Sequence, residues 1–389
     1  MSDATANNSG TRRANVLHVI CVSDFYGTQR SVLSTARSVD PGRFRCMVAA
    51  PFGEAFFSEL ERAGIPAFEV PMRNLSDVGS MRNLASIIRK ESVDIVHCHL
   101  GISTFLGLLA ARLAGCRRRV VTRHFIRDRY TTVNPAVYPL YLSIYRWMGR
   151  EADVTICVSG AVRKAVAARE RIPEQRCVVV PNGIRLPGTG AGREEARRSV
   201  REEFGLPADA GLVVTLSRLA PEKGLETLVD AAARCAYRVP GASFIVAGEG
   251  ELEETLRKRA AKLGIGGRFI FAGFRDDAQR LLAAADLYVL PGPNESFGVS
   301  LLEAMALGVP SIAMRAGGPA EIIENGKNGF LVFPRNTTEL AEKVVSLLTD
   351  AELAMEIGWR GAERARDFEE KAVAAKIEKI YAGPMEKKK

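Results

Sequence analysis

Two glutamates eight residues apart, Glu295 and Glu303, are the side chains of this sequence with the most informative setting. An apolar strand is predicted to end at Leu290, a loop then holds Glu295, and a helix is predicted to begin near residues 297–299, with Glu303 a little over one turn into it. Carboxylates accept hydrogen bonds from neighbouring hydroxyls, and the free N–H groups of a helix start favour an anion. The pattern therefore indicates a site for a sugar or ribose beside a phosphate.

The alternative for this glutamate pair is two solvated surface acids, which would be the better interpretation of an isolated pair. The neighbours of Glu303 argue against it, because they are Leu301, Leu302, Ala304 and Met305. We therefore expect Glu303 to be at least partly enclosed.

Two cations, Arg218 and Lys223, lie five residues apart between a predicted strand and the next helix. An arginine fork and a lysine point charge on one such loop can converge on a diphosphate, although alone they would be ordinary solvated cations. The sequence Gly248-Glu249-Gly250 follows the next predicted strand. Its glycines allow backbone to approach a ligand or form a tight turn.

The histidines His97 and His99 share one face of a predicted strand, and His124 follows the next strand. A metal site formed by these three residues is an alternative that we disfavour, because only Asp94 and Cys98 offer a further ligand nearby. We predict that His97 and His99 end their strand near the ligand site and that His124 acts as a hydrogen-bond donor.

Apolar runs alternate with helical patterns along the whole chain, which predicts parallel sheets covered on both faces. The expected strands are residues 15–22, 45–50, 67–70, 95–98, 119–122, 154–158 and 177–180, and then 212–216, 243–247, 268–272, 286–290 and 309–313. The glycines and prolines of residues 181–191 predict a linker, with the domain boundary near residue 186. Such sheets bind ligands beyond the carboxyl ends of their strands, so two of them offer a cleft.

The composition is that of a folded protein of two or three domains: 389 residues, 47% hydrophobic and 25% charged. The seven cysteines form no C-x-x-C pair, which disfavours a disulfide framework or a zinc ribbon. Neither a signal peptide nor a membrane-spanning stretch is recognisable. Residues 1–14 are expected to be a disordered tail, and we expect a cytoplasmic protein.

The basic residues gather in one window, residues 111–150, which holds nine arginines, one acid and interspersed aromatic residues. Arginines beside aromatics suit an anionic membrane surface, which predicts peripheral contact with the inner face of the cytoplasmic membrane. The alternative is an ordinary solvated face. A nucleic-acid partner is not expected, because no recognition motif of that class is present.

These motifs together resemble the retaining glycosyltransferases of family 4, glycosyl transferases group 1, whose GT-B fold has two Rossmann-like doubly wound parallel-sheet domains facing across a cleft. The resemblance covers nearly the whole chain. The segments that carry it are Arg218 with Lys223, Gly248-Glu249-Gly250, Glu295-x7-Glu303, Gly317-Gly318-Pro319-Ala320-Glu321, Asp94-Ile-Val-His97-Cys-His99, Thr122-Arg123-His124, Val158-Ser159 and Pro181-Asn182-Gly183-Ile184. It implies an acceptor-binding domain over residues 15–186, a nucleotide-sugar-binding domain over residues 187–366, and a terminal helix, residues 367–389, that crosses back to the first domain.

The resemblance implies roles for particular residues. Arg218 and Lys223 would hold the donor diphosphate, Glu303 the ribose hydroxyls and Glu295 those of the transferred sugar. The other implied site residues are the backbone of Phe297, Gly298 and Val299 for the sugar, Phe274 for the nucleobase, Gly27 for the phosphate and acceptor, and His124 near the anomeric carbon. The chain departs from the family pattern at Tyr26-Gly27-Thr28-Gln29, where a glycine pair is common, and at Ser296, where glycine is common.

The implied activity is retaining, metal-independent, hexosyltransferase-type transfer from a UDP- or GDP-sugar to a hydroxyl of a glycan or lipid-linked acceptor, without a cofactor. Its setting would be cell-envelope polysaccharide or glycolipid synthesis. No Asp-x-Asp motif, of the kind that binds a donor through a metal ion, is present. The alternatives are a sugar-nucleotide epimerase or hydrolase, or a non-catalytic scaffold, of the same fold.

Overall fold

The computed structural model describes residues 12–22, 27–126, 137–188 and 192–383. The chain forms two compact units. The first comprises residues Met1–Cys157, Val166–Val180 and Val373–Lys389, and the second comprises Val158–Ala165 and Pro181–Ala372. The division in the linker thus falls at Pro181, a few residues before the expected boundary at 186, and the last residues return to the first unit.

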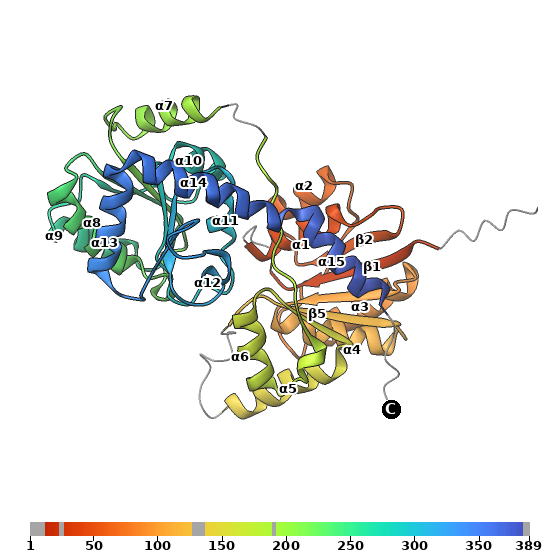
Figure 1. Ribbon diagram of the computed structural model, residues 1–389. Helices are drawn as coiled ribbons and strands as arrows, with labels where there is room; N and C mark the ends of the chain where they lie inside the picture. The colour runs from red at the N-terminus through yellow and green to blue at the C-terminus, as the bar shows by residue number, and fades with distance from the viewer. Residues whose placement is uncertain (1–11, 23–26, 127–136, 189–191, 384–389) are drawn as a thin grey trace, which may run out of the picture. The chain divides into compact units, whose positions relative to one another are not determined.

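The first unit contains a seven-stranded sheet in the order β3-β2-β1-β4-β5-β6-β7, in which every pair is parallel (Figure 1). The strands are β1 (Ala14–Ile20), β2 (Phe44–Ala50), β3 (Ala67–Glu69), β4 (Ile95–His99), β5 (Arg118–Arg123), β6 (Val154–Cys157) and β7 (Cys177–Val179). The helices are α1 (Gly27–Ser38), α2 (Glu54–Arg62), α3 (Val78–Lys90), α4 (Gly101–Leu113), α5 (Tyr138–Glu151) and α6 (Gly160–Glu170), the last of which begins in the second unit.

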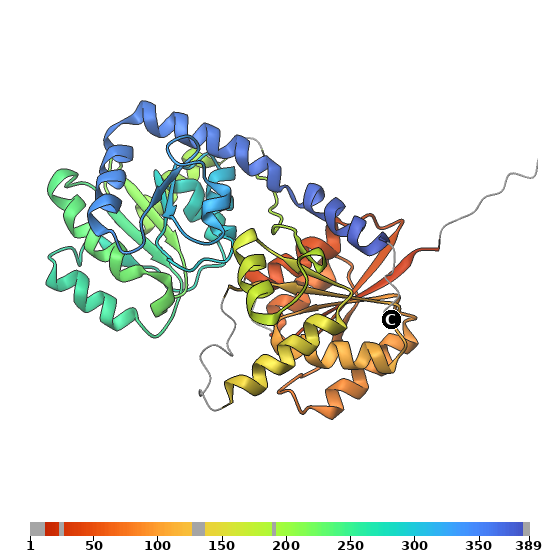
Figure 2. The same cartoon turned by 60° about the horizontal axis from the view of Figure 1, so that its bottom comes forward.

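The two faces of this sheet carry separate cores because side chains alternate along each strand. Leu17 and Val19 of β1 belong to one apolar cluster, and Val16 and Ile20 to the other. Helix α15 (Glu370–Ala382) lies along the second face beside α1 and β1 (Figures 1 and 2). Its residues Val373, Ile377 and Tyr381, spaced four apart, enter that core.

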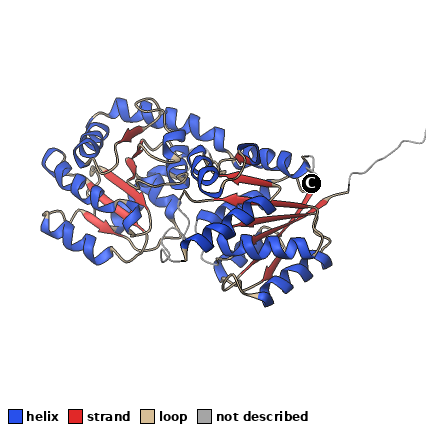
Figure 3. Cartoon of the chain, turned by 90° about the horizontal axis from the view of Figure 1, so that it is seen from below, coloured by secondary structure: helices blue, strands red, loops and turns tan. Residues whose placement is uncertain are grey.

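The second unit contains a six-stranded parallel sheet in the order β10-β9-β8-β11-β12-β13. Its strands are β8 (Leu212–Leu216), β9 (Ser243–Ala247), β10 (Phe269–Phe271), β11 (Leu287–Leu290), β12 (Ser311–Met314) and β13 (Phe330–Val332). Its helices are α7 (Arg193–Glu203), α8 (Leu225–Arg238), α9 (Glu253–Lys262), α10 (Ala278–Ala284), α11 (Val299–Ala306), α12 (Pro319–Ile322), α13 (Thr337–Thr349) and α14 (Ala351–Ala365). In each unit the strands lie between layers of helices (Figure 3).

The predicted alternation of strands and helices is confirmed, with ends shifted by a few residues. The first strand ends at Ile20 rather than residue 22, and the strand β13 was not predicted. The expected tail of residues 1–14 was too long. The Ala14 N–H donates to the Arg43 carbonyl over 2.8 Å, and Arg12 forms an ion pair with Asp94, while residues 1–11 lie outside the described residues.

Candidate functional site

The predicted anion- and sugar-binding residues gather in the second unit, at the carboxyl ends of β8 and β11. These two strands are neighbours in the sheet although two strands separate them in the chain. The strand order reverses at this point, which is where a parallel sheet of this kind is expected to offer a crevice for a ligand. Arg218 and Lys223 follow β8, and Glu295 follows β11.

Lys223 and Glu295 meet directly in this crevice. The Lys223 Nζ donates to Glu295 Oε1 over 2.8 Å, and both side chains are largely shielded from solvent. Gly224, in the left-handed conformation with φ of 66°, permits the close approach of the two loops, because a Cβ there would lie 2.2 Å from the carbonyl oxygen of Pro291. The tertiary structure thus brings a residue predicted to bind phosphate into contact with a residue predicted to bind the sugar.

Arg218 does not join this pair. Its Nη2 donates to Glu222 Oε1 over 2.6 Å within the same loop, and about half of each side chain is exposed. The convergence of Arg218 and Lys223 on a diphosphate therefore stays a prediction. The Glu222 carboxylate is bonded to the Arg218 guanidinium, which is the group that the family resemblance assigns to the diphosphate.

Helix α11 begins at Val299, within the range that the sequence predicted. Gly298 precedes the helix with φ of 104°, a conformation that favours glycine, and no side chain caps the helix at that residue. Phe297 is buried against Phe368, with ring centroids 5.8 Å apart. Gly318 packs on this loop, and its N–H donates to the Glu295 carbonyl over 2.9 Å. The first N–H groups of α11, from Val299 onward, are therefore positioned for an acceptor.

Glu303 is half-buried on α11, and the neighbouring Tyr288 lies beneath the same helix. The Tyr288 hydroxyl donates to Ser300 Oγ over 2.7 Å. Burial raises the pKa of Tyr288, and the negative charges of Glu295 and Glu303 contribute to the increase. Both carboxylates therefore act on one small region around the start of α11.

The glycine-rich loop after β9 packs against the loop after β8. A Cβ on Gly248, where φ is 143°, would lie 2.0 Å from the Ser217 carbonyl oxygen. The Leu219 N–H donates to the Glu249 carbonyl over 2.9 Å, which fixes the backbone ahead of the 3₁₀ turn Pro221–Lys223. Phe274, after β10, is about half exposed, and its N–H lies 3.4 Å from Glu249 Oε1.

Gly27 and His124 belong to the first unit. Gly27 is the first residue of α1, and a Cβ there would meet nothing within 4 Å among the described residues, so packing does not require this glycine. His124 follows β5 and is 8% exposed.

The four histidines of the chain form one buried cluster in the first unit. His18 and His97 are register partners on β1 and β4, and His99 lies two residues further along β4. Burial lowers the pKa of His18 and His124 to about 3 and holds the pKa of His97 and His99 well below the usual range. These rings are therefore neutral at pH 7.

A metal ion could be shared, by distance, among His18, His97 and His99, whose ligand atoms lie within 4.8 Å of one another. This trio differs from the one considered from sequence, because it contains His18 in place of His124. Both ring nitrogens of His97 are already bonded, Nδ1 to the Tyr381 hydroxyl and Nε2 to the Thr122 hydroxyl, each over 2.7 Å. Coordination by His97 would have to displace one of these hydroxyls.

The arginine-rich window does not form one exposed basic face, which corrects that expectation for several residues. Arg118 and Arg123 are buried, the first bonded to the Gly383 carbonyl and the second paired with Glu170 over 2.8 Å. Arg119 pairs with Glu151 and Asp153. Arg127 and Arg129 lie outside the described residues, and the exposed arginines among the rest are Arg112, Arg117 and Arg150.

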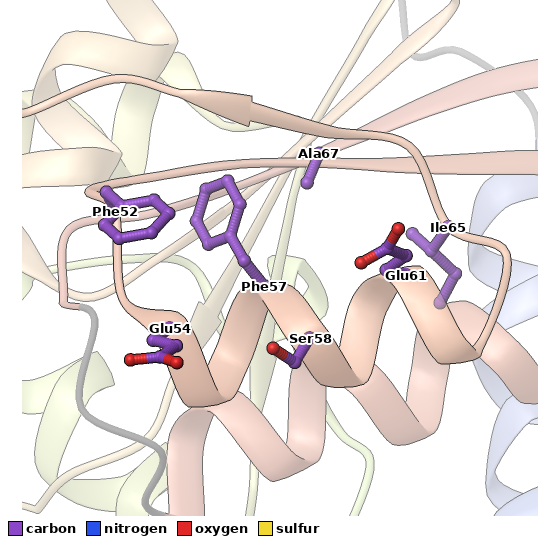
Figure 4. Close-up of a pocket in the computed structure, with 7 residues that line it drawn as sticks. All are labelled: Phe52, Glu54, Phe57, Ser58, Glu61, Ile65 and Ala67. Carbon is purple, nitrogen blue, oxygen red and sulfur yellow. The ribbon is translucent and has the colours of Figure 1, made fainter.

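A surface cavity of about 430 Å³ lies in the first unit between α2 and the strand β3. The rings of Phe52 and Phe57 line one part of it, and Glu54 and Glu61 extend from α2 on another (Figure 4). None of the predicted site residues lines this cavity. It is therefore separate from the crevice at β8 and β11.

Several residues at these sites were not identified from sequence. Glu222 was missed because a glutamate between proline and lysine looks like an ordinary surface acid. Glu321, noted only as part of a motif, accepts from the N–H groups of Gly160 and Ala161 over 2.8 Å each, within the second unit. His18 could have been found only from the pairing of β1 with β4.

Comparison with known proteins bears on the same regions. Residues 25–186 match the family described as glycosyltransferase family 4, and residues 196–364 match the family described as glycosyl transferases group 1.

No helix in the described part of the chain combines the length and apolar character needed to span a bilayer.

Among curated proteins, the chain is 33% identical over 284 residues to a GDP-mannose-dependent alpha-(1-6)-phosphatidylinositol monomannoside mannosyltransferase of Mycobacterium tuberculosis, covering 69% of this chain and 71% of that protein. It is 28% identical to N-acetyl-alpha-D-glucosaminyl L-malate synthase of Bacillus anthracis, covering 84% of this chain and 83% of that protein. Among solved structures, Alr3699/HepE of Anabaena in complex with UDP-glucose superposes with a TM-score of 0.81 at 25% identity, covering 95% of this chain and 99% of that one.

Proposed function

This chain belongs to the glycosyltransferases of group 1, family 4, and from that premise we propose that it transfers a hexosyl group from a UDP- or GDP-sugar to a hydroxyl of a glycan or lipid-linked acceptor. The transfer retains the configuration of the anomeric carbon and needs no metal ion. The donor classes are supported by relatives whose names and complexes include GDP-mannose and UDP-glucose.

The observation that carries this proposal is the meeting of Lys223, Glu295 and the start of α11 at the β8–β11 crevice. A sugar diphosphate needs cations and N–H donors for its phosphates and acceptors for its hydroxyls. The crevice offers both within one small region. Glu303, half-buried on α11, is the acceptor that we assign to the ribose.

The ion pairs of Lys223 and Arg218 must rearrange before the donor binds. Lys223 is neutralised by Glu295 and Arg218 by Glu222, so a diphosphate must compete with two carboxylates. We assign to the arriving phosphates the displacement of Glu222 from Arg218. The phosphates likewise displace Glu295 from Lys223, and the released Glu295 then accepts from the hydroxyls of the transferred sugar.

The chemical step places negative charge on the leaving diphosphate. The acceptor oxygen forms a bond to the anomeric carbon while the bond from that carbon to the β-phosphate oxygen breaks, and the bonding electrons leave with the diphosphate. The acceptor proton passes to the departing phosphate oxygen. Arg218, Lys223 and the α11 N-terminus stabilise the charge that develops.

A thermal-shift experiment tests the donor site. We expect one of UDP, GDP and their sugar conjugates to raise the Tm equally in magnesium and in chelator, and we expect Glu303→Ala to abolish that shift. Glu254→Ala is a matched control, because Glu254 is an exposed glutamate paired only with Lys258 among the described residues. Lack of a shift with every nucleotide, or an equal shift in both variants, would contradict the assignment.

We also propose peripheral contact with an anionic membrane through the start of α5. Val137 and Leu140 are exposed there, and Phe125 is exposed after β5, which suits insertion at a lipid interface. We expect Leu140→Glu to reduce sedimentation with vesicles that contain phosphatidylglycerol, and Met355→Glu on α14 to leave it unchanged. Equal sedimentation with vesicles of phosphatidylcholine alone would contradict an electrostatic contribution.

A further inference from the structure

Three histidines of the first unit are linked, ring to ring, into a hydrogen-bonded chain. His18 Nδ1 lies 3.1 Å from His99 Nε2, and His99 Nδ1 lies 3.1 Å from His124 Nε2. The chain runs from the most deeply buried ring to the most accessible one: His18 is fully buried, and His124 retains 8% of its surface. His124 is the residue for which the family resemblance implies a position near the anomeric carbon.

The direction of hydrogen bonding along this chain must be uniform. A neutral imidazole has one N–H donor and one bare nitrogen acceptor, so each ring that donates on one side accepts on the other. The rings are neutral because burial lowers the pKa of each. Either all three carry hydrogen on Nδ1, or all three carry it on Nε2.

The buried end of the chain distinguishes the two arrangements. His18 Nε2 has no hydrogen-bond partner in the part of the chain that the structure describes. With hydrogen on Nε2 throughout, that buried N–H would point at no acceptor, which is a rare and costly arrangement. With hydrogen on Nδ1 throughout, every buried N–H of the chain has an acceptor, and only a bare nitrogen is left unpaired.

We propose that His18 and His99 are positioning residues that hold His124 as its Nδ1–H tautomer, so that His124 presents a hydrogen-bond donor to the sugar nucleotide. The chain uses Nε2 of His124 and leaves Nδ1 for a ligand. His124 then donates to a sugar hydroxyl or phosphate oxygen and does not serve as a proton acceptor. This inference rests on the proposed function for the ligand, but the tautomer itself follows from the first unit alone.

His97 provides an internal control because it lies in the same cluster but outside the chain. Its ring centroid is 4.3 Å from that of His99, yet its nitrogens bond the hydroxyls of Tyr381 and Thr122. Replacing His97 perturbs the packing of the cluster without removing a link of the chain. Replacing His99 removes both links.

Long-range ¹⁵N–¹H correlation spectra of the full chain, with ¹⁵N-labelled histidine rings, test the proposal, and four rings make assignment by substitution practical. We expect Nδ1–H patterns for His18, His99 and His124, which is the tautomer that free imidazole rings disfavour in water. His99→Leu should move His124 towards Nε2–H or tautomer averaging, whereas His97→Gln should leave it unchanged. Nε2–H or averaging for His124 in the wild type overturns the proposal even if His99→Leu does not fold.

Two further readouts separate the possible failures. Stoichiometric Zn²⁺ should leave the ring nitrogens of His18, His97 and His99 unshifted, and selective shifts would make the cluster a metal site and overturn the proposal. If sugar transfer is observed, His99→Leu should lower kcat about tenfold or more, as expected when a tautomer-setting partner is lost. A wild type without transferase activity but with the Nδ1–H pattern would contradict the proposed function and support the tautomer assignment.

Discussion

Acidification from pH 7.5 to 5.5 should destabilise the first unit far more than the second, because all four histidines are buried in the first. Each imidazole is neutral when folded, since burial lowers its pKa, to about 3 for His18 and His124. Each ring regains a pKa of about 6.5 on unfolding. The unfolded chain therefore binds protons that the folded chain does not bind. The free energy of unfolding that is present above pH 6.5 is lost as the pH falls below that value.

The size of the effect follows from the number of protons. A group that protonates only in the unfolded state contributes about 1.4 kcal/mol of lost stability between pH 7.5 and 5.5. Four such histidines give a loss of about 5 kcal/mol, which is comparable with the total stability of a small domain, about 5–15 kcal/mol. The His97→Gln variant should lose about 4 kcal/mol over the same interval.

The two tryptophans allow each unit to be followed separately. Trp147 packs against Phe105 in the first unit, and Trp359 lies on α14 in the second. We expect urea unfolding of the Trp359→Phe variant, which retains Trp147, to show the full loss, and that of the Trp147→Phe variant to show little change. A change of less than about 1 kcal/mol at Trp147 would refute buried, neutral histidines in the folded state.

Three other changes have definite expected outcomes. Glu222→Gln should raise the affinity for the nucleoside diphosphate up to about fivefold at low salt, because the exposed pair with Arg218 is worth at most about 1 kcal/mol. Calorimetry at two salt concentrations measures this change in affinity. Gly224→Ala should lower the stability of the second unit by about 2 kcal/mol or more in urea, whereas Gly241→Ala, where a Cβ meets nothing within 4 Å among the described residues, should change it little. Glu170→Gln should cost about 3–5 kcal/mol in urea unfolding of the first unit, because it removes the carboxylate that pairs with the buried Arg123 over 2.8 Å, and a loss below 1 kcal/mol would contradict that pairing.

The position of each candidate residue along the chain could be predicted because the patterns that identify it are local. An apolar strand followed by a glycine turn and an amphipathic helix is recognisable within some twenty residues. That reasoning places Arg218, Lys223 and Glu295 at the carboxyl ends of their strands, where the structure has them. It missed β13.

What the sequence by itself determined is therefore the alternation of strands and helices, the two parallel sheets and the strand ends that carry the candidate ligands. Only the tertiary structure decided which of these side chains meet. The pairing of β8 with β11 brings Lys223 to Glu295, and that of β1 with β4 brings His18 to His97. The physical reason is that strand order and register depend on the burial of side chains from distant segments, so neither appears in any local pattern.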